Sequence, residues 1–144
     1  MEELRALPPF EHDFDTPEGA VLCLEDAYRR KSIESACACK SFMIEGAVEL
    51  LNVDPKLAAD PELRKKKAAF SERAFRKELS EAWPMLDGVE SFFVDRQIYT
   101  NGIVAVIEIR RAPDGTFTKV NHLVAITNSG WRVLNQISED ELDW

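Results

Sequence analysis

The sequence is poor in the residues that build metal and nucleophile sites. It has two histidines, His12 and His122, and three cysteines, and these form neither a His-x-x-x-His pair nor a Cys-x-x-Cys motif. Those are the spacings by which one element presents two ligands to a zinc ion. A glycine-rich phosphate loop and a Gly-x-Ser-x-Gly turn are absent as well. The sequence therefore predicts no metal, no cofactor, no nucleotide site and no serine-hydrolase site.

Long apolar runs are also absent, and the first fifteen residues contain no basic segment followed by an apolar stretch. A transmembrane helix needs about 20 apolar residues, and a secretory leader needs that basic-then-apolar order. The odd cysteine count, with Cys23, Cys37 and Cys39 at no framework spacing, is typical of a reducing compartment. We therefore expect a cytoplasmic protein that does not associate with membranes.

Basic residues are scarce at both ends of the chain. Residues 1–27 carry eight acids and one base, and residues 138–144 carry four acids and no base. Since the whole chain has a net charge of −8, the residues in between have a net charge of +3. A nucleic-acid-binding face must be basic to displace counterions from phosphates, so the charge argues against a nucleic-acid partner. It favours solubility or, as the alternative, a basic protein partner.

The most basic segment, residues 63–79, holds seven bases interleaved with Phe70 and Phe75. Such a mixture could contact RNA, but it is also typical of an amphipathic helix. We expect both phenylalanines to point into the core while the bases cover the solvated side.

The chain of 144 residues, 45% of them hydrophobic, is expected to form one domain, with residues 1–14 and 138–144 flexible. Its first half predicts three helices. The first has Thr16 as its N-cap and Pro17 at its first position, the second begins after Ser32, and the third begins after Asp60 and ends before Pro84.

In the second half the apolar period changes to two, and Asn-Gly, Asp-Gly and Asn-Ser-Gly divide the segment into four stretches. Asn-Gly and Asp-Gly favour two-residue hairpin turns because both central residues need positive φ. Four strands are therefore predicted, at residues 91–99, 103–111, 116–126 and 131–137. The fold class is α+β, with three N-terminal helices packed on one face of a strongly curved antiparallel sheet.

The second predicted strand, residues 103–111, has apolar residues at both its odd and its even positions as far as Ile107. A strand of this kind is covered on both faces. We expect Glu108 and Arg110, at its far end, to return to solvent or to line a cavity.

The order of elements and several motifs resemble the nuclear transport factor 2-like superfamily of cone-shaped α+β domains. Within it, residues 16–42 look like the opening of the bacterial immunity proteins of that fold, from polymorphic toxin systems, and the RRAPDGTF hairpin and closing WRV strand look like their tail. The matching residues of the opening are Thr16, Pro17, Glu18, Leu24, Glu25, Ala27, Tyr28, Lys31, Ile33, Ala38, Cys39, Lys40 and Phe42. The resemblance spans roughly residues 14 to 137. It implies a cytoplasmic, non-enzymatic protein that binds and neutralises a cognate toxin.

Enzymes of the same superfamily work in the mouth of the cone, which implies an alternative. His122 is the best candidate for proton transfer, and either Glu108 or Asp95 could orient it. With Tyr28, these residues would line a cavity for a small-molecule-binding or isomerase- or dehydratase-like protein. A structural or surface histidine is the other interpretation of His122.

For the toxin-binding hypothesis, the candidate contact residues lie in the acidic tail, residues 138–144. A large aromatic residue beside carboxylates resembles an interface anchor with a charged rim, although the tail could also serve solubility alone. The candidates are Glu139, Asp140, Glu141, Asp143 and Trp144. Homodimerisation through the sheet is a further possibility compatible with either function.

Overall fold

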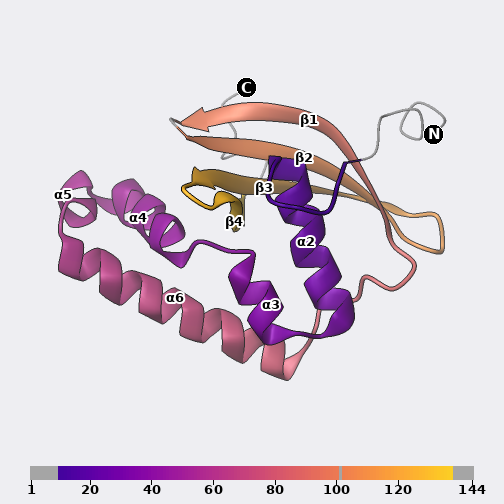
Figure 1. The fold of residues 1–144 in the computed structure, drawn as a ribbon, viewed down its shortest axis with the longest axis horizontal. Helices are drawn as coiled ribbons and strands as arrows, with labels where there is room; N and C mark the ends of the chain where they lie inside the picture. The colour runs from indigo at the N-terminus through magenta and orange to yellow at the C-terminus, as the bar shows by residue number, and fades with distance from the viewer. Residues whose placement is uncertain (1–9, 101, 138–144) are drawn as a thin grey trace.

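The computed structural model describes residues 10–100 and 102–137. In chain order the helices come first and the strands of one sheet follow (Figure 1). The described helices are α2 (Pro17–Arg30), α3 (Ile33–Ala38), α4 (Phe42–Val53), α5 (Pro55–Ala58) and α6 (Pro61–Glu81). The strands are β1 (Glu90–Thr100), β2 (Ile103–Arg111), β3 (Phe117–Thr127) and β4 (Gly130–Ile137). The prediction of an α+β chain, with helices first and four antiparallel strands second, is confirmed.

The starts of the first and last helices follow their caps, as predicted. The Thr16 hydroxyl accepts a hydrogen bond from Gly19 N at 2.9 Å, and Pro17 occupies the first turn of α2. The Asp60 carboxylate accepts from Glu62 N at 3.0 Å at the start of α6. These side chains satisfy amide donors that have no partner within the helix, which fixes where each helix begins.

The prediction of one continuous helix after Ser32 is wrong, because the chain breaks into α3 and α4. Between them, Cys39 O accepts from Val133 N at 2.8 Å and Ser41 N donates to Val133 O at 3.2 Å. The connection thus pairs with β4, and Ser41 caps a new helix by accepting from Ile44 N at 3.3 Å. A short helix that was not predicted, α5, also forms before α6, so the described chain has five helices rather than three.

The sheet is an open meander in the order β1-β2-β3-β4, with β1 and β4 at its edges. Gly102 (φ 77°) and Gly115 (φ 89°) adopt the positive φ expected in the first two turns. The register shifts twice between β1 and β2 and once between β3 and β4. Irregularities of this kind bend strands, and Figure 1 shows β1 arching over the sheet.

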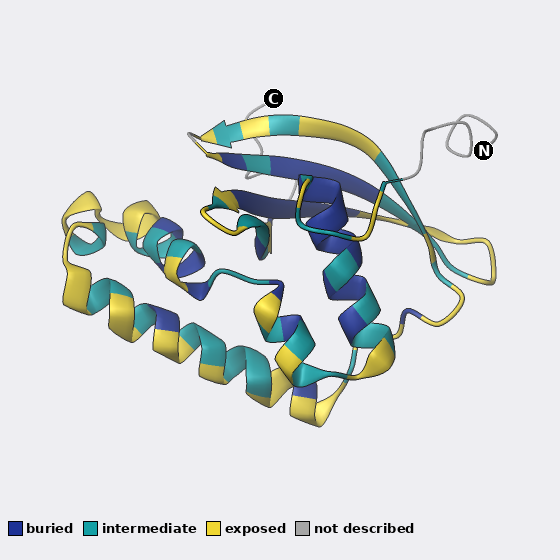
Figure 2. Ribbon diagram, viewed as in Figure 1, coloured by how far each residue is buried: buried dark blue, intermediate teal, exposed yellow. Residues whose placement is uncertain are grey.

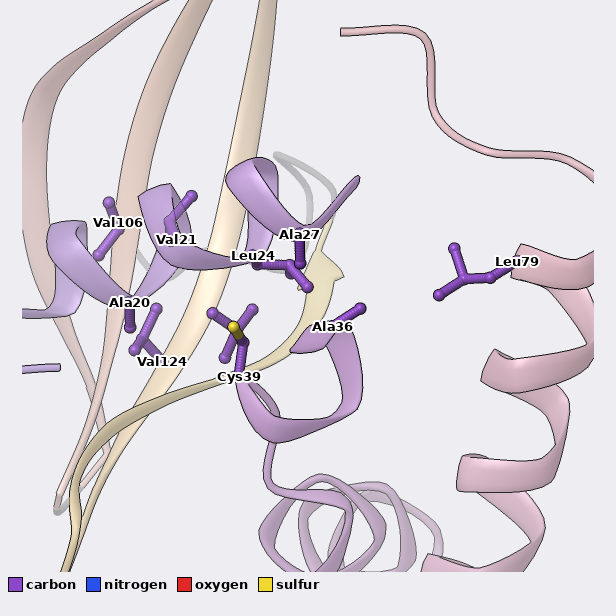
Figure 3. Close-up of a cluster of buried hydrophobic side chains, with 10 residues drawn as sticks. Ala20, Val21, Leu24, Ala27, Ala36, Cys39, Leu79, Val106 and Val124 are labelled. Atoms are coloured by element: carbon purple, nitrogen blue, oxygen red, sulfur yellow. The ribbon is translucent and has the colours of Figure 1, made fainter. Parts of the chain in front are cut away.

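Two apolar clusters lie on opposite faces of β2. Val106 packs with Val124, Val133 and the apolar side of α2, which supplies Ala20, Val21, Leu24 and Ala27 (Figure 3). The neighbouring Ile107 belongs to the second cluster, with Ile103, Ala105, Leu123, Ala125, Leu134, Ile137 and Val48 of α4. Burial of β2 on both faces is therefore confirmed (Figure 2). Because Val48 joins the second cluster, the helices do not all pack on one face.

The prediction that both phenylalanines of α6 are buried is wrong for one of them. Phe75 packs against the first cluster, whereas Phe70 is 58% exposed, with Lys67 Nζ 5.4 Å from its ring centroid. Residues five positions apart on a helix point about 140° apart, so one narrow apolar face cannot bury both. Trp83 and Trp131 are also partly buried against the first cluster.

The described part of the segment expected to be flexible, residues 10–14, contacts the folded body. Phe14 O accepts from Trp131 N at 2.8 Å, and the Arg132 guanidinium lies 3.8 Å from the centroid of the Phe14 ring. The Phe10 ring lies edge-on to that of Phe93, with 5.7 Å between centroids.

None of the helices in the described ranges has the length and apolar character needed to cross a bilayer.

Candidate functional site

Five polar residues from four elements meet at the interface between α2 and the sheet. We call them the ionic cluster: Glu25 of α2, Ser91 of β1, Glu108 and Arg110 of β2, and His122 of β3. Strand register brings them together, because Ser91 pairs with Arg110 and Val106 pairs with His122. Val106 and Glu108, two residues apart, present their side chains to the same face of β2.

Each carboxylate of the ionic cluster has partners at hydrogen-bond distance. Glu108 Oε1 lies 2.8 Å from His122 Nε2 and accepts from Arg110 Nε at 3.1 Å. The two oxygens of Glu25 accept from Ser91 Oγ at 2.8 Å and from Arg110 Nη2 at 3.2 Å. The arginine therefore bridges the two glutamates, and the serine orients one of them.

The ionic cluster is almost inaccessible to solvent. Glu108 is 0% exposed, Glu25 1% and His122 2%, while the Arg110 side chain keeps 19%. Burial, followed by interaction with the Glu108 carboxylate, raises the pKa of Glu25 to about 8. Burial alone would raise the pKa of Glu108 too, but interactions with His122, Glu25 and Arg110 outweigh it and hold that pKa below its usual range. At neutral pH, Glu25 thus keeps a proton and Glu108 is ionised.

The donor set of the ionic cluster also resembles that of a metal site. Glu25, Glu108 and His122 can each offer one ligand atom, and these atoms lie within 4.8 Å of one another. However, Arg110 already places a positive charge against both carboxylates. A divalent ion beside the guanidinium would leave excess positive charge in a buried site, which is costly. The arrangement suits the retention of a proton better than the binding of a cation.

A second candidate site is an open groove of about 480 Å³ between α4, α5, the start of α6 and the β1–β2 hairpin. Its lining is apolar apart from Thr100 and Arg64, and it consists of Met43, Ile44, Ala47, Val48, Leu51, Ala58, Arg64, Thr100 and Ile103. Met43 and Leu51 are 48% and 51% exposed. The groove therefore presents apolar side chains to solvent beside one cationic group.

No protein-family model, curated protein or solved structure matches this chain. The resemblance to nuclear transport factor 2-like proteins thus rests on the sequence motifs alone and stays a prediction.

The residues proposed for a cavity in the cone are only partly brought together. His122 and Glu108 lie 2.8 Å apart, so one of the two predicted pairs, His122 with Glu108, forms. Asp95, the other candidate partner, is exposed on β1, and its carboxylate accepts from Arg96 N at 2.8 Å. Tyr28 packs against Phe75 and Trp83, at centroid distances of 6.5 and 6.4 Å, and burial raises the pKa of its phenol.

One expectation about the end of β2 is wrong. Glu108 neither returns to solvent nor faces open space, because α2 covers it and supplies Glu25 next to it. The proposed toxin contacts Glu139, Asp140, Glu141, Asp143 and Trp144 lie outside the described residues.

Sequence reasoning missed Glu25, Ser91 and Arg110 as members of a site. A signal for Glu25 was present, since it lies four residues after Val21 and three before Tyr28, on the apolar side of α2. A carboxylate in such a position needs a buried partner. The same pattern holds for Glu18, which is 3% exposed and bonded to Arg96 Nε at 3.0 Å. No comparable signal points to Arg64 in the groove.

Proposed function

We propose that this protein is a cytoplasmic, non-enzymatic immunity protein that binds and neutralises a cognate toxin, as its resemblance to such proteins implies. The observation that supports the non-enzymatic part is the burial of the His122–Glu108 pair, at 2% and 0% exposure. A general acid or base must come within about 3 Å of the substrate atom that gains or loses the proton. With α2 packed over the pair, its geometry suits a structural hydrogen bond.

The uneven charge supports a protein partner. Exposed acids such as Glu11 and Asp15 precede α2, and four more acids lie in the acidic tail. Acidic groups on one side of an interface speed association with a basic partner and disfavour partners of like charge. The cone shape expected of the superfamily is part of the same proposal.

The direct test expresses this protein together with the toxin encoded beside its gene. Survival of cells that die with the toxin alone is the expected result, and death in both cases would reject the proposal.

The acidic tail is tested separately by deleting residues 138–144 and measuring toxin affinity by calorimetry. We expect weaker binding. A matched variant of unchanged length, with Gln or Asn in place of the four acids, shows whether charge accounts for the loss, and Trp144→Ala shows the part of the aromatic ring. Wild-type affinity for the deletion would remove the tail from the interface.

A second candidate function, proton transfer on a small molecule, is favoured by the 2.8 Å contact between His122 and Glu108. It requires that the α2 cover opens. Diethyl pyrocarbonate measures this opening, because it modifies accessible imidazoles. In a His12→Ala background, which removes the exposed histidine, we expect strong protection of His122, whereas modification as fast as that of free imidazole would favour the enzyme.

A further inference from the structure

We infer that the groove between α4, α5 and the β1–β2 hairpin binds a small amphipathic anion, with an apolar body and one carboxylate, as in a medium-chain fatty acid. The inference rests on the combination of an open apolar lining with one unpaired, half-buried guanidinium. It is independent of the proposed function, since the groove shares no lining residue with the ionic cluster and the proposed function gives the groove no role.

The apolar part of the groove has the size and composition of a ligand site. Small-molecule sites are typically concave, of roughly 300–1,000 Å³, and mostly apolar with few polar groups. The groove measures about 480 Å³, and seven of its nine lining residues are apolar. Their side chains come from α4, α5 and β2, so the lining is fixed by packed elements on three sides.

Arg64 specifies the charge of the ligand. Among the described residues, its guanidinium donates from Nη1 to Ala58 O at 2.9 Å, and no carboxylate lies within ion-pair distance. The acids nearest to Arg64 in sequence have other partners: Asp60 accepts from Glu62 N and Leu63 N at 3.0 and 3.4 Å, and Glu62 lies 3.9 Å from Lys65 Nζ. A half-buried arginine without a counter-charge loses hydration and gains little in return. A carboxylate at the same end of the groove would supply the missing charge in a paired geometry.

Arginines elsewhere in the described chain have other partners. The half-buried Arg132 stacks on the Phe14 ring, 3.8 Å from its centroid, and three more arginines pair with carboxylates. Arg96 pairs with Glu18, Arg110 with Glu25 and Glu108, and Arg76 with Glu34 and Glu72. In each case the chain supplies the carboxylate itself. At Arg64 the chain supplies one carbonyl oxygen, so the position is complementary to an anion from outside.

The test is isothermal titration calorimetry with decanoate, decanol and decylamine as probes, which share one chain length and differ in charge. We expect saturable binding of decanoate, with decanol weaker by on the order of tenfold because it lacks the charge-assisted bond. Decylamine is expected to bind more weakly than decanol. Equal affinity of decanoate and decanol, or no saturable decanoate binding, would overturn the inference.

Two variants locate the site. Arg64→Leu should reduce decanoate affinity on the order of tenfold and leave decanol within threefold, and Arg73→Leu, on the exposed side of the same helix, is the matched control. Ala47→Met fills the groove without touching the charge and should weaken both probes. If Arg64→Leu fails to fold, Arg64→Lys tests the same position and should keep the preference for decanoate. Wild-type binding of both probes to Ala47→Met would place the site elsewhere and refute the inference.

The same variants separate this inference from the proposed function. If the protein protects cells from its toxin, Ala47→Met should still protect them, because the groove is not required for that activity. A protein that fails to protect cells but binds decanoate through Arg64 would refute the proposed function and support the groove.

Discussion

The ionic cluster and the groove differ in whether their charged groups have partners within the chain. In the ionic cluster, two carboxylates, a guanidinium and an imidazole are removed from solvent, and every one of them contacts a partner from the same chain. In the groove, apolar side chains remain exposed and Arg64 lacks a carboxylate. Buried charge must be matched within the fold, since an unpaired ion there costs several kcal/mol. The exposed apolar surface beside Arg64 remains accessible to a ligand, so the groove is a better binding site than the ionic cluster.

The sharpest test of this comparison removes one partner from the ionic cluster. Glu108→Ala leaves His122 without its carboxylate and Arg110 with Glu25 alone, and we expect a loss of about 3–5 kcal/mol in the free energy of unfolding. Urea denaturation measures the loss. Asp95→Ala, on the exposed part of β1, is the control and should change the same quantity by less than about 0.5 kcal/mol. Equal effects of the two substitutions would show that the cluster does not depend on its charges.

The pH dependence of stability sharpens the assignment of the proton to Glu25. Its folded-state pKa, about 8, lies above the 4.5 of a free carboxyl, so the folded state binds the proton more tightly. The stabilisation is complete below pH 4.5 and is lost as the pH rises towards 8, by at most about 1.4 kcal/mol per pH unit. Glu108, with its lowered pKa, has the opposite effect, which is confined to acidic pH.

Glu25→Gln isolates this effect because the amide imitates the protonated acid. We expect the wild type to lose stability relative to Glu25→Gln between pH 5 and pH 8, as measured by urea denaturation at several pH values. Parallel curves for the two proteins would mean that Glu25 is ionised in the folded state over that range.

A smaller effect is expected at the edge of the ionic cluster. Ser91→Ala removes the hydroxyl that donates to Glu25 Oε1 at 2.8 Å, and leaving that oxygen unbonded should cost about 1–2 kcal/mol. Ser80→Ala, in exposed α6, removes a hydroxyl that donates to Lys77 O and should cost less than about 0.5 kcal/mol. Thermal unfolding of both variants distinguishes them, and the same melting temperature for both would count against a role of Ser91 in the cluster.

The smallest stability effect is expected in the groove. Leu51→Gln and Met43→Gln replace side chains that are about half exposed, so each should change the free energy of unfolding by less than about 0.5 kcal/mol. Chemical denaturation checks this. A loss comparable to that of Glu108→Ala would show that the groove lining is part of the core, which would remove the contrast between the two regions.

Predictability from sequence also differs between the two regions. His122 and Glu108 could be proposed as a pair because they lie on neighbouring predicted strands, and the structure joins them at 2.8 Å. Glu25 was detectable as a carboxylate on an apolar helix side, but its partner was not, because Arg110 is 85 residues away. The groove could not be predicted at all, since it needs the break between α3 and α4 and the placement of α4 beside the hairpin.

The sequence by itself determined where three of the five described helices begin and where the described chain changes from helices to strands. Thr16, Ser32 and Asp60 place helix starts, glycines after Asn or Asp place turns, and the change of apolar period at residue 91 separates helices from strands. These signals are local because each acts within one or two turns of the backbone. Only the tertiary structure decided that Cys39–Ser41 pairs with β4, that α2 buries Glu108, and that Arg64 meets an apolar groove. Those outcomes depend on which residues distant in sequence come into contact, and contact between elements is what settles burial and charge pairing.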